Sequence, residues 1–235
     1  MTFQPIGEKL SEWKELEESI IACRLCSRLV EWREYVARQR RRAFRNEEYW
    51  GKAVPGFGDH GARILIVGLA PGAHGANRTG RMFCGDGSGE FLYNALHRFG
   101  FANQPNCTHR EDSIEVFDVF ISAICRCVPP ANKPTRQEII QCLPYLQREI
   151  ALLDNVKVVV ALGRIAFENT LYLYRLLDKA IPNFEFRHGA VYKLGERLPW
   201  LIASYHPSRQ NTQTKRLTSN MFNEIWEKAK NLCAQ

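Results

Sequence analysis

Four short stretches of the chain are dominated by apolar residues, at residues 63–67, 117–124, 156–162 and 200–204. Short, mainly apolar stretches of this length are typical of strands that are buried on both faces. Between them the pattern predicts helices at residues 89–99, from Thr135 through Cys142, at 166–177 and at 217–232. Strands that alternate with helices predict an α/β fold, a three-layer α/β/α sandwich around a mainly parallel four-stranded sheet.

The segment ahead of the first strand, residues 11–45, is predicted to be helical. Its apolar residues recur close to helical spacing, at Trp13, Leu16, Ile20, Leu29, Trp32 and Val36. No linker-like composition separates it from the rest, so we expect one domain over residues 1–235 with a helical N-terminal segment. Ser88 is expected to cap the helix at 89–99, and Thr135 with Glu138 forms the pattern of a capping box.

Three polar loops follow predicted strands, at residues 68–81, 127–133 and 206–209. The carboxyl ends of parallel strands meet at one edge of a sheet, which is where open α/β folds bind ligands. The first of these loops, residues 68–81, is called the glycine loop below. It has four glycines and a proline, which let the backbone approach a flat or anionic ligand. The alternative is a plain strand-to-helix connection.

Composition is that of an ordinary globular protein, with 45% hydrophobic and 24% charged residues. The net charge of +7 favours a polyanionic partner. No apolar run approaches the roughly 20 residues of a membrane span. Because Met1 to Leu10 has no apolar signal region, we expect the chain to stay in the cytoplasm.

Arginines concentrate at one place, with five in the eight residues 38–45. Charge runs are usually solvated helix faces. Beside the positive net charge, the alternative is a segment that contacts phosphates.

The eight cysteines are expected to be thiols or metal ligands rather than disulfides. Cys23 and Cys26 fall on one face of a helix or turn, so both can reach one metal centre. With Cys127 and Cys142 they could hold zinc or an iron–sulfur cluster. Spacing selects neither the metal nor Cys127 over Cys125. The remaining cysteines, Cys84, Cys107 and Cys233, are expected to be core or surface thiols.

His206 and Phe83 are the other candidates for chemistry. His206 directly follows the last strand, opposite the glycine loop, and is either structural or an acid or electrostatic catalyst. Phe83 lies between glycine-rich segments, where it either stacks on a planar ligand or covers the edge of the core.

Several separated motifs together resemble the uracil-DNA glycosylase superfamily, and most closely its family 5, which contains a cluster. The matching pieces are Gly68-Leu69-Ala70-Pro71-Gly72, the continuation His74-Gly75-Ala76-Asn77-Arg78-Thr79-Gly80-Arg81, Tyr49-Trp50-Gly51 leading to Val54-Pro55-Gly56-Phe57-Gly58-Asp59, Cys127-Val128-Pro129-Pro130, and His206-Pro207-Ser208. The likeness runs from about Cys23 to the C-terminal helix. It implies a monofunctional enzyme that flips deaminated bases, uracil above all, out of DNA and hydrolyses the N-glycosidic bond.

The resemblance also implies roles for single residues. Cys23, Cys26, Cys127 and Cys142 would hold a structural [4Fe–4S] cluster. His206 would hydrogen-bond the uracil oxygen, and Phe83 would stack on the flipped base. The base pocket would be lined by Gly68, Leu69, Ala70, Pro71, Gly72 and His74. Phosphates near the flipped nucleotide would be held by Arg78, Arg81, Ser208 and Arg209.

The sequence departs from related families at two places. Leu69 and Ala70 stand where those families carry an acidic side chain, so Asn132, then Asn77, are the candidates for orienting water, with Asp86 as the nearby carboxylate. Ala123 stands near a position where some relatives carry asparagine, which predicts looser base choice that includes hypoxanthine and xanthine.

Two other classes remain as alternatives. A non-catalytic iron–sulfur nucleic-acid-binding protein on the same scaffold would keep the arginines and the cluster without needing His206. A nucleotide hydrolase or redox protein would need a Gly-Lys-Ser/Thr phosphate loop, which Gly80-Arg81 does not supply. We expect a monomer on the nucleoid that acts on single- and double-stranded DNA, with a sliding clamp or other repair proteins as possible partners.

Overall fold

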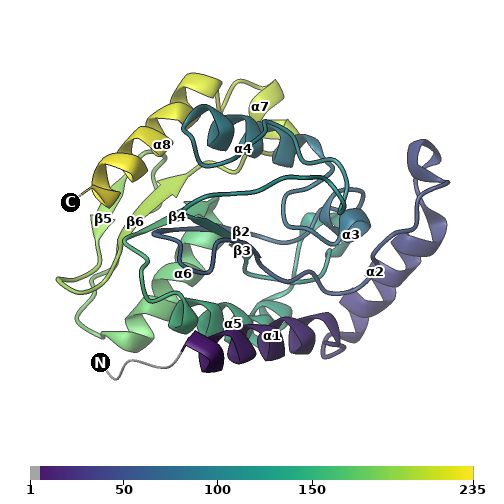
Figure 1. Cartoon of the computed structure of the whole chain (residues 1–235), viewed down its shortest axis with the longest axis horizontal. Helices are drawn as coiled ribbons and strands as arrows, with labels where there is room; N and C mark the ends of the chain where they lie inside the picture. Colours follow the sequence, from purple (N-terminus) through teal and green to yellow (C-terminus); the bar gives the residue numbers. More distant parts are fainter. Residues whose placement is uncertain (1–5, 235) are drawn as a thin grey trace.

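A twisted sheet lies between two layers of helices in the computed structural model, which describes residues 6–234 (Figure 1). Its centre is four parallel strands, β3 (Val119–Ala123), β2 (Ile64–Gly68), β4 (Val158–Leu162) and β6 (Trp200–Ser204). Two short antiparallel strands form the edges, β1 (Phe57–Gly58) beside β3 and β5 (Val191–Lys193) beside β6. The three-layer α/β/α prediction is confirmed, and the sheet has six strands in the order β1-β3-β2-β4-β6-β5 instead of four.

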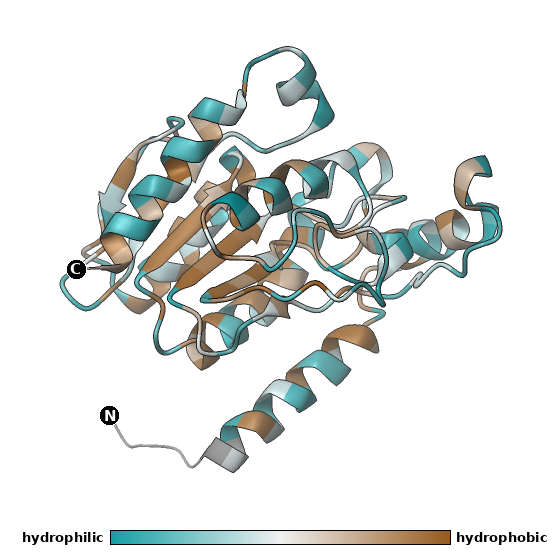
Figure 2. Ribbon diagram, turned by 45° about the horizontal axis from the view of Figure 1, so that its top comes forward, coloured by the Kyte–Doolittle hydropathy of each residue, from teal (hydrophilic) through white to brown (hydrophobic). Residues whose placement is uncertain are grey.

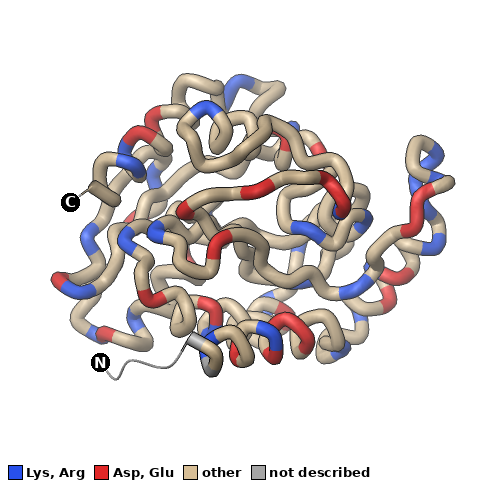
Figure 3. Tube along the Cα trace, in the orientation of Figure 1, with Lys and Arg blue, Asp and Glu red and all other residues tan. Residues whose placement is uncertain are grey.

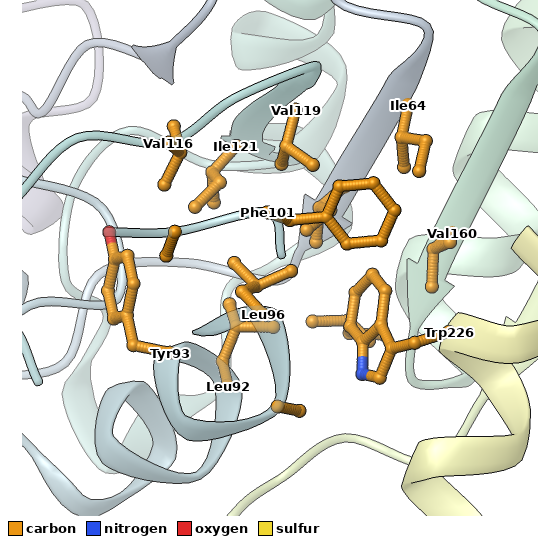
Figure 4. Close-up of a cluster of buried hydrophobic side chains, with 14 of the residues drawn as sticks. Ile64, Leu92, Tyr93, Leu96, Phe101, Val116, Val119, Ile121, Val160 and Trp226 are labelled. Atoms are coloured by element: carbon orange, nitrogen blue, oxygen red, sulfur yellow. The ribbon is translucent and has the colours of Figure 1, made fainter. Parts of the chain in front are cut away.

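The two faces of the sheet belong to separate apolar clusters, because successive residues of a strand point to opposite faces. Ile64 and Ile66 of β2 pack with α4 (Gly87–Arg98) and α8 (Ser219–Cys233). Leu65 and Val67 pack with α1 (Ile6–Ile21), α5 (Arg136–Leu152) and α6 (Arg164–Leu177). Figure 2 shows the resulting apolar strands between helices whose outer faces are hydrophilic. In Figure 4, Trp226 of α8 and Phe101 point toward each other over Ile64.

The N-terminal segment is broken in two. The single predicted helix over residues 11–45 is wrong, because α1 ends at Ile21 and α2 (Ser27–Gln39) begins after a break of five residues. Cys23 and Cys26 lie in this break. The 3₁₀ helix η1 (Arg42–Phe44) follows α2. Three apolar residues of α1 are buried in the cluster beneath the sheet: Trp13, Leu16 and Ile20. One domain over residues 1–235 stays a prediction, because this range includes residues outside the described part of the chain.

Helix caps agree with the sequence at one place and correct it at another. Thr135 accepts from the N–H of Glu138, and Glu138 accepts from the N–H of Thr135, so the predicted capping box is present. Ser88 is not the cap of α4. Asp86 caps that helix and accepts from the N–H groups of Ser88 and Gly89.

One pair of cysteines is joined. A disulfide links Cys84 to Cys107, so the expectation of two separate thiols there is wrong. Cys233 is a buried thiol, as expected. The disulfide ties the segment after the glycine loop to the connection that precedes β3.

The charged side chains are carried mostly by loops and by the outward faces of the helices (Figure 3). Between residues 6 and 234, no helix is both long enough and apolar enough to cross a membrane. The prediction of a cytoplasmic chain rests on residues 1–10, and residues 1–5 lie outside the described part of the chain. It stays a prediction.

Candidate active site and cysteine centre

The loops that follow β2, β4 and β6 meet at one edge of the sheet. The sequence predicted one shared cleft for the loops at residues 68–81, 127–133 and 206–209. The first and third contribute to the cleft, whereas residues 127–133 do not line it and the loop after β4 takes their place. A cleft of about 700 Å³ opens there, and Leu69, Gly163 and His206 line it from these three strand ends. Its volume is in the range of small-ligand sites. The outer wall carries three arginines and no acidic residue, and it is formed by Arg164, Ile165, Phe186, Arg187, His188, Tyr205, Asn211, Arg216 and Met221. The positive charge of this wall suits a phosphodiester chain.

His206 occupies the end of β6 with its ring against that of Phe83. The two ring centroids lie 5.8 Å apart, with 28° between the planes. Burial lowers the pKa of His206 to about 4, so its imidazole is neutral at neutral pH. A neutral imidazole in such a site can donate one N–H to a carbonyl oxygen without carrying charge itself.

Phe83 rests on the end of β2. A Cβ at Gly68 would lie 2.7 Å from two carbons of the Phe83 ring, so only glycine lets this ring approach the strand. Phe83 has a left-handed backbone, with φ of 54°, which costs energy in a phenylalanine. Gly89 allows this conformation, because a Cβ there would lie 1.6 Å from the Phe83 carbonyl oxygen. Backbone strain held in this way is a feature of functional sites.

Asp86 fastens the glycine loop to α4. Its Oδ1 accepts from the N–H groups of Ser88 and Gly89, both at 3.0 Å. Its Oδ2 lies against Gly72 and Gly75, where an added Cβ would come within 2.4 Å and 2.1 Å of it. Oδ1 is thus used in the helix cap, while Oδ2 faces the glycine loop, and the role of Asp86 as a base stays a prediction.

Asn77 and Arg78 do not reach the cleft. Asn77 is fully buried and its Nδ2 donates to the carbonyl oxygen of Arg33 at 3.2 Å. Arg78 is buried as well, forms an ion pair with Glu47 and donates to the carbonyl oxygen of His74. Both side chains thus make contacts inside the protein and neither lines the cleft, while Asn77 Oδ1 has no hydrogen-bond partner among the described residues. The roles of Asn77 in orienting water and of Arg78 in holding phosphate stay predictions that this arrangement does not support.

Arg81 is also engaged within the protein. Its guanidinium donates to the carbonyl oxygens of Arg110 and Asp112 and lies 4.7 Å from the ring centre of Phe57. Phosphate binding by Arg81 stays a prediction that these contacts do not support.

Ser208 and Arg209, which were predicted to hold phosphates, follow His206 closely in the chain. The Ser208 hydroxyl oxygen caps α7 (Arg209–Gln213) by accepting from the N–H of Asn211. Arg209 is exposed and lies beside Gly87 at the start of α4. Phosphate binding by Ser208 and Arg209 stays a prediction.

Of the other residues that were predicted to line the base pocket, some line the cleft and others lie inside the protein. Leu69 lines the cleft, whereas Ala70 packs against the apolar cluster beneath the sheet. Pro71 is buried. His74 turns away from the cleft, and its Nδ1 lies 3.1 Å from the hydroxyl of Tyr49. Its place in the base pocket stays a prediction, and His74 does not line the cleft in this structure.

Asn132 and Ala123 lie on either side of the loop after β3. Ala123 is buried and pairs with Gly68, next to the strand position that Phe83 covers. Asn132 is exposed at the end of η2 (Pro130–Asn132), with a left-handed backbone at φ of 56°. Asn132 thus stays the first candidate for orienting water, outside the cleft lining.

The cysteine quartet, Cys23, Cys26, Cys127 and Cys142, surrounds one small closed cavity. Its members come from the α1–α2 break, from the loop after β3 and from α5. Cys125, two residues before Cys127, is fully buried but does not line this cavity. The structure therefore favours Cys127 over Cys125, a choice that spacing left open.

The surroundings of the quartet suit bound thiolates. Arg33 Nη1 donates to Cys127 Sγ at 2.9 Å, and the N–H of Arg126 donates to Cys142 Sγ at 3.2 Å. Both guanidiniums are buried, and Arg33 Nε and Arg126 Nε and Nη1 lack a partner among the described residues. Burial raises the pKa of the Cys127 thiol to about 12, so this sulfur would need a bound cation or cluster to be a thiolate at neutral pH. The residues present thus fit a metal group.

A second group of possible ligand atoms lies elsewhere. Cys84, Cys107 and Asp112 have ligand atoms within 4.8 Å of one another, but the two cysteines are joined by the disulfide. That bond leaves no thiolate for a metal.

A family model described as the uracil DNA glycosylase superfamily matches residues 55–230. This chain belongs to that superfamily. A type-5 uracil-DNA glycosylase of Thermus thermophilus is 53% identical over 216 residues, which are 92% of this chain and 95% of the relative. Type-5 uracil-DNA glycosylases of Mycobacterium bovis and Pyrobaculum aerophilum are 47% and 40% identical, over 93% and 89% of this chain and 81% and 88% of their own lengths. The family named from the sequence motifs, family 5, is confirmed.

Several residues of the site were not predicted from the sequence. Gly163 could have been found, since it follows a predicted strand as the glycine loop does. Tyr205 and His188, whose rings stack 4.8 Å apart in the cleft wall, carried no signal. Neither did Arg33 and Arg126, because isolated arginines in a sequence are expected at the surface.

Proposed function

We propose that this chain hydrolyses the N-glycosidic bond of uracil, and of deaminated purines, in DNA and leaves an abasic site. The observation that carries the proposal is the neutral His206 at the end of β6, stacked on Phe83 and open to a cleft walled by arginines. Membership of the superfamily and the names of its type-5 relatives support the same reaction. The function is thus argued from the site and from the family together.

Cleavage of the glycosidic bond leaves positive charge on the sugar and negative charge on the departing base. His206 would donate an N–H to the uracil oxygen that gains this charge, and a donor fixed before the reaction stabilises the transition state without reorganisation. Free N–H groups of the glycine loop at the end of β2 would supply further donors. The cleft arginines would hold the phosphates of the flipped nucleotide.

No carboxylate stands at Leu69 or Ala70 to take a proton from water. Asp86 uses one of its carboxylate oxygens in the cap of α4. We therefore assign most of the rate to stabilisation of the departing base, with Asn132 as the side chain that orients the water. A cationic sugar is attacked by neutral water more readily than an uncharged one, so orientation suffices where a strong base is missing.

Base choice is proposed to be broad. Ala123 presents a methyl group where an asparagine amide would read one edge of the base, so the pocket lacks a polar group that rejects purines. A site without such a hydrogen-bonding group discriminates weakly between bases. Hypoxanthine and xanthine are therefore included among the substrates.

The test is single-turnover release of base from single-stranded DNA and from duplexes that contain G·U, T·hypoxanthine or an undamaged pair. We expect uracil to be released from both forms, hypoxanthine to be released more slowly, and undamaged bases to be retained. Rapid uracil release with intact hypoxanthine would contradict the role of Ala123. Tight DNA binding with no release of any base would instead favour a non-catalytic nucleic-acid-binding protein.

We further propose that the cysteine quartet holds a [4Fe–4S] cluster. The group would supply a cross-link among the α1–α2 break, the loop after β3 and α5, with no part in the hydrolysis. Four cysteines around one closed cavity and buried N–H donors near the sulfurs support this assignment. The monomeric state, a sliding-clamp partner and nucleoid association stay predictions from the sequence.

Two matched variants test the cluster assignment. Cys127→Ser is expected to lose most of the iron and inorganic sulfide and the visible absorbance, because the cavity loses one of its four thiols. Cys125→Ser removes a neighbouring buried thiol outside the cavity lining and should keep about four iron atoms per chain, as the wild type does. Equal loss in both variants, or zinc in place of iron in the wild type, would overturn the assignment.

A further inference from the structure

The most exposed concentration of positive charge lies away from the cleft, at the end of α2. We call residues 38–46 the arginine arm. In Figure 1 this part of the chain extends outward beyond α3 (Ala76–Thr79), and Figure 3 shows its basic residues. Its five arginines are all exposed: Arg38, Arg40, Arg41, Arg42 and Arg45. Among residues 6–234 none of the five forms an ion pair, and residues 35–46 contain no acidic side chain.

The arm is held firmly at its base. Phe44, its one large apolar side chain, lies under the guanidinium of Arg78, which is 4.1 Å from the ring centre. Arg78 also forms its ion pair with Glu47, just beyond the arm. The N–H of Arg41 donates to the hydroxyl of Tyr49 at 3.3 Å. A charge run that is merely solvated would not need a buried arginine and a stacked aromatic ring to hold it in place.

The anchors of the arm are connected to the glycine loop. His74 contacts the Tyr49 hydroxyl, Arg78 follows four residues later, and Asn77 donates to the carbonyl oxygen of Arg33 in α2. The backbone N–H groups of Trp50 and Gly51 add bonds to the carbonyl oxygens of Arg78 and Asn77. The polar residues after the first glycines thus place the arm at a fixed position relative to the loop that ends β2.

The buried arginine at the base of the arm and the arginines on the arm differ in whether they are paired with a carboxylate. Arg78, at the base of the arm, is paired with Glu47, whereas the five arm arginines face solvent and form no ion pair among residues 6–234. Arg38 alone has a carboxylate in electrostatic range, that of Glu34 in α2. Unpaired guanidiniums on a rigid projection repel one another and slightly destabilise the fold. Such an arrangement is stabilised when a polyanion of regular spacing binds it, and guanidinium groups match phosphate geometry well.

We propose that the arginine arm is a second DNA contact, which binds backbone phosphates of the duplex that flanks the nucleotide held in the cleft. The inference rests on the proposed function for the identity of the polyanion. The arm contacts neither His206 nor the cleft lining, so it contributes to affinity and not to the chemical step. It would carry no sequence information, since phosphate contacts position a protein without reading bases.

The test compares two triple variants that lose the same charge. The arm variant is Arg38→Gln/Arg41→Gln/Arg42→Gln, which keeps the bond from Arg40 to the carbonyl oxygen of Arg45. The control is Lys179→Gln/Lys193→Gln/Arg197→Gln, three exposed cations on the segment around β5. Binding to a uracil-containing duplex is measured from about 0.05 to 0.2 M salt, on short and long duplexes. Thermal unfolding of both variants verifies that they fold.

The arm variant should bind roughly 10- to 100-fold more weakly at 0.1 M salt, and its slope of log affinity against log salt should fall by about 2 to 3. The control should stay near the wild type. Wild type and control should gain affinity as the duplex is lengthened, whereas the arm variant should gain less. The rate of base release at saturating DNA should be the same in all three proteins.

An arm variant that matches the control in affinity, salt slope and duplex-length dependence would overturn the proposal. Failure of the proposed function looks different. A wild type that releases no base, but whose DNA binding still weakens on loss of the arm arginines, would remove the glycosylase assignment and uphold the arm. A slower release rate at saturating DNA would also count against the proposal, because it would place the arm in the chemical step.

Discussion

His206→Ala is expected to slow uracil release by about 10²- to 10³-fold at saturating DNA, with affinity for DNA changed only a few fold. The imidazole is a neutral donor at the end of β6 that lines the cleft beside the glycine loop, and its loss removes stabilisation that is needed only as the base departs. The measurement is single-turnover release, compared with the wild type. His97→Ala is the control, since this histidine is exposed on α4, away from the cleft.

The pH dependence tests the protonation state of His206. Because burial holds its pKa near 4, the imidazole is neutral above about pH 5, and the rate should be level from about pH 6 to 8. The rate should fall only as the pH approaches 4, where the ring becomes charged. A rate that rises as the pH falls through 6.5, and that loses this dependence in His206→Ala, would show that the imidazolium is the active form.

Glu149→Gln is expected to lower the free energy of unfolding by about 3 kcal/mol, the lower end of the range for breaking a buried ion pair. Glu149 and Arg126 are each 1% exposed, and the same carboxylate oxygen accepts from Arg126 and from Ser122 of β3. The amide still accepts these hydrogen bonds but leaves the Arg126 charge uncompensated. For a chain of this size the loss corresponds to a melting temperature lower by roughly 10 °C.

The control for this prediction is Glu34→Gln, the same change of atoms at the exposed pair with Arg24. Exposed ion pairs contribute at most about 1 kcal/mol, so the melting temperature should shift by only a few degrees. Equal shifts in the two variants would contradict the importance of burial. Iron content should be measured alongside, because Arg126 also neighbours the cysteine quartet.

The central sheet and the residues at its strand ends could be predicted from the sequence, because a strand buried on both faces leaves a short, mainly apolar stretch. β1 and β5 could not, since edge strands of two or three residues, Phe57–Gly58 and Val191–Lys193, are too short to show a period. The break between α1 and α2 was hidden for a related reason. Residues 22–26 contain neither glycine nor proline, and the break is fixed by contacts around Cys23 and Cys26.

The site shows where sequence reasoning fails in physical terms. Asn77 and Arg78 have the residue types of ligand-binding groups, and a sequence does not reveal which way such a side chain points. Their direction is set by partners far along the chain, Arg33 for Asn77 and Glu47 for Arg78. His206 was found because it stands at a strand end, and Cys23 and Cys26 because they form a close pair, positions that limit where a side chain can go. Cys127 and Cys142 were assigned to the same centre only by the family resemblance.

The cysteine quartet also fixes an order of events during synthesis. Its first two members leave the ribosome early, but the set is complete only after residue 142 of 235 has been added. Until then α1 and α2 have no partner in α5, and their buried faces need protection from other chains. β4 and β6 follow still later, so the thiols are assembled before the strand that carries His206 exists. A chain whose synthesis stops between these points would contain all four cysteines of the quartet but not His206.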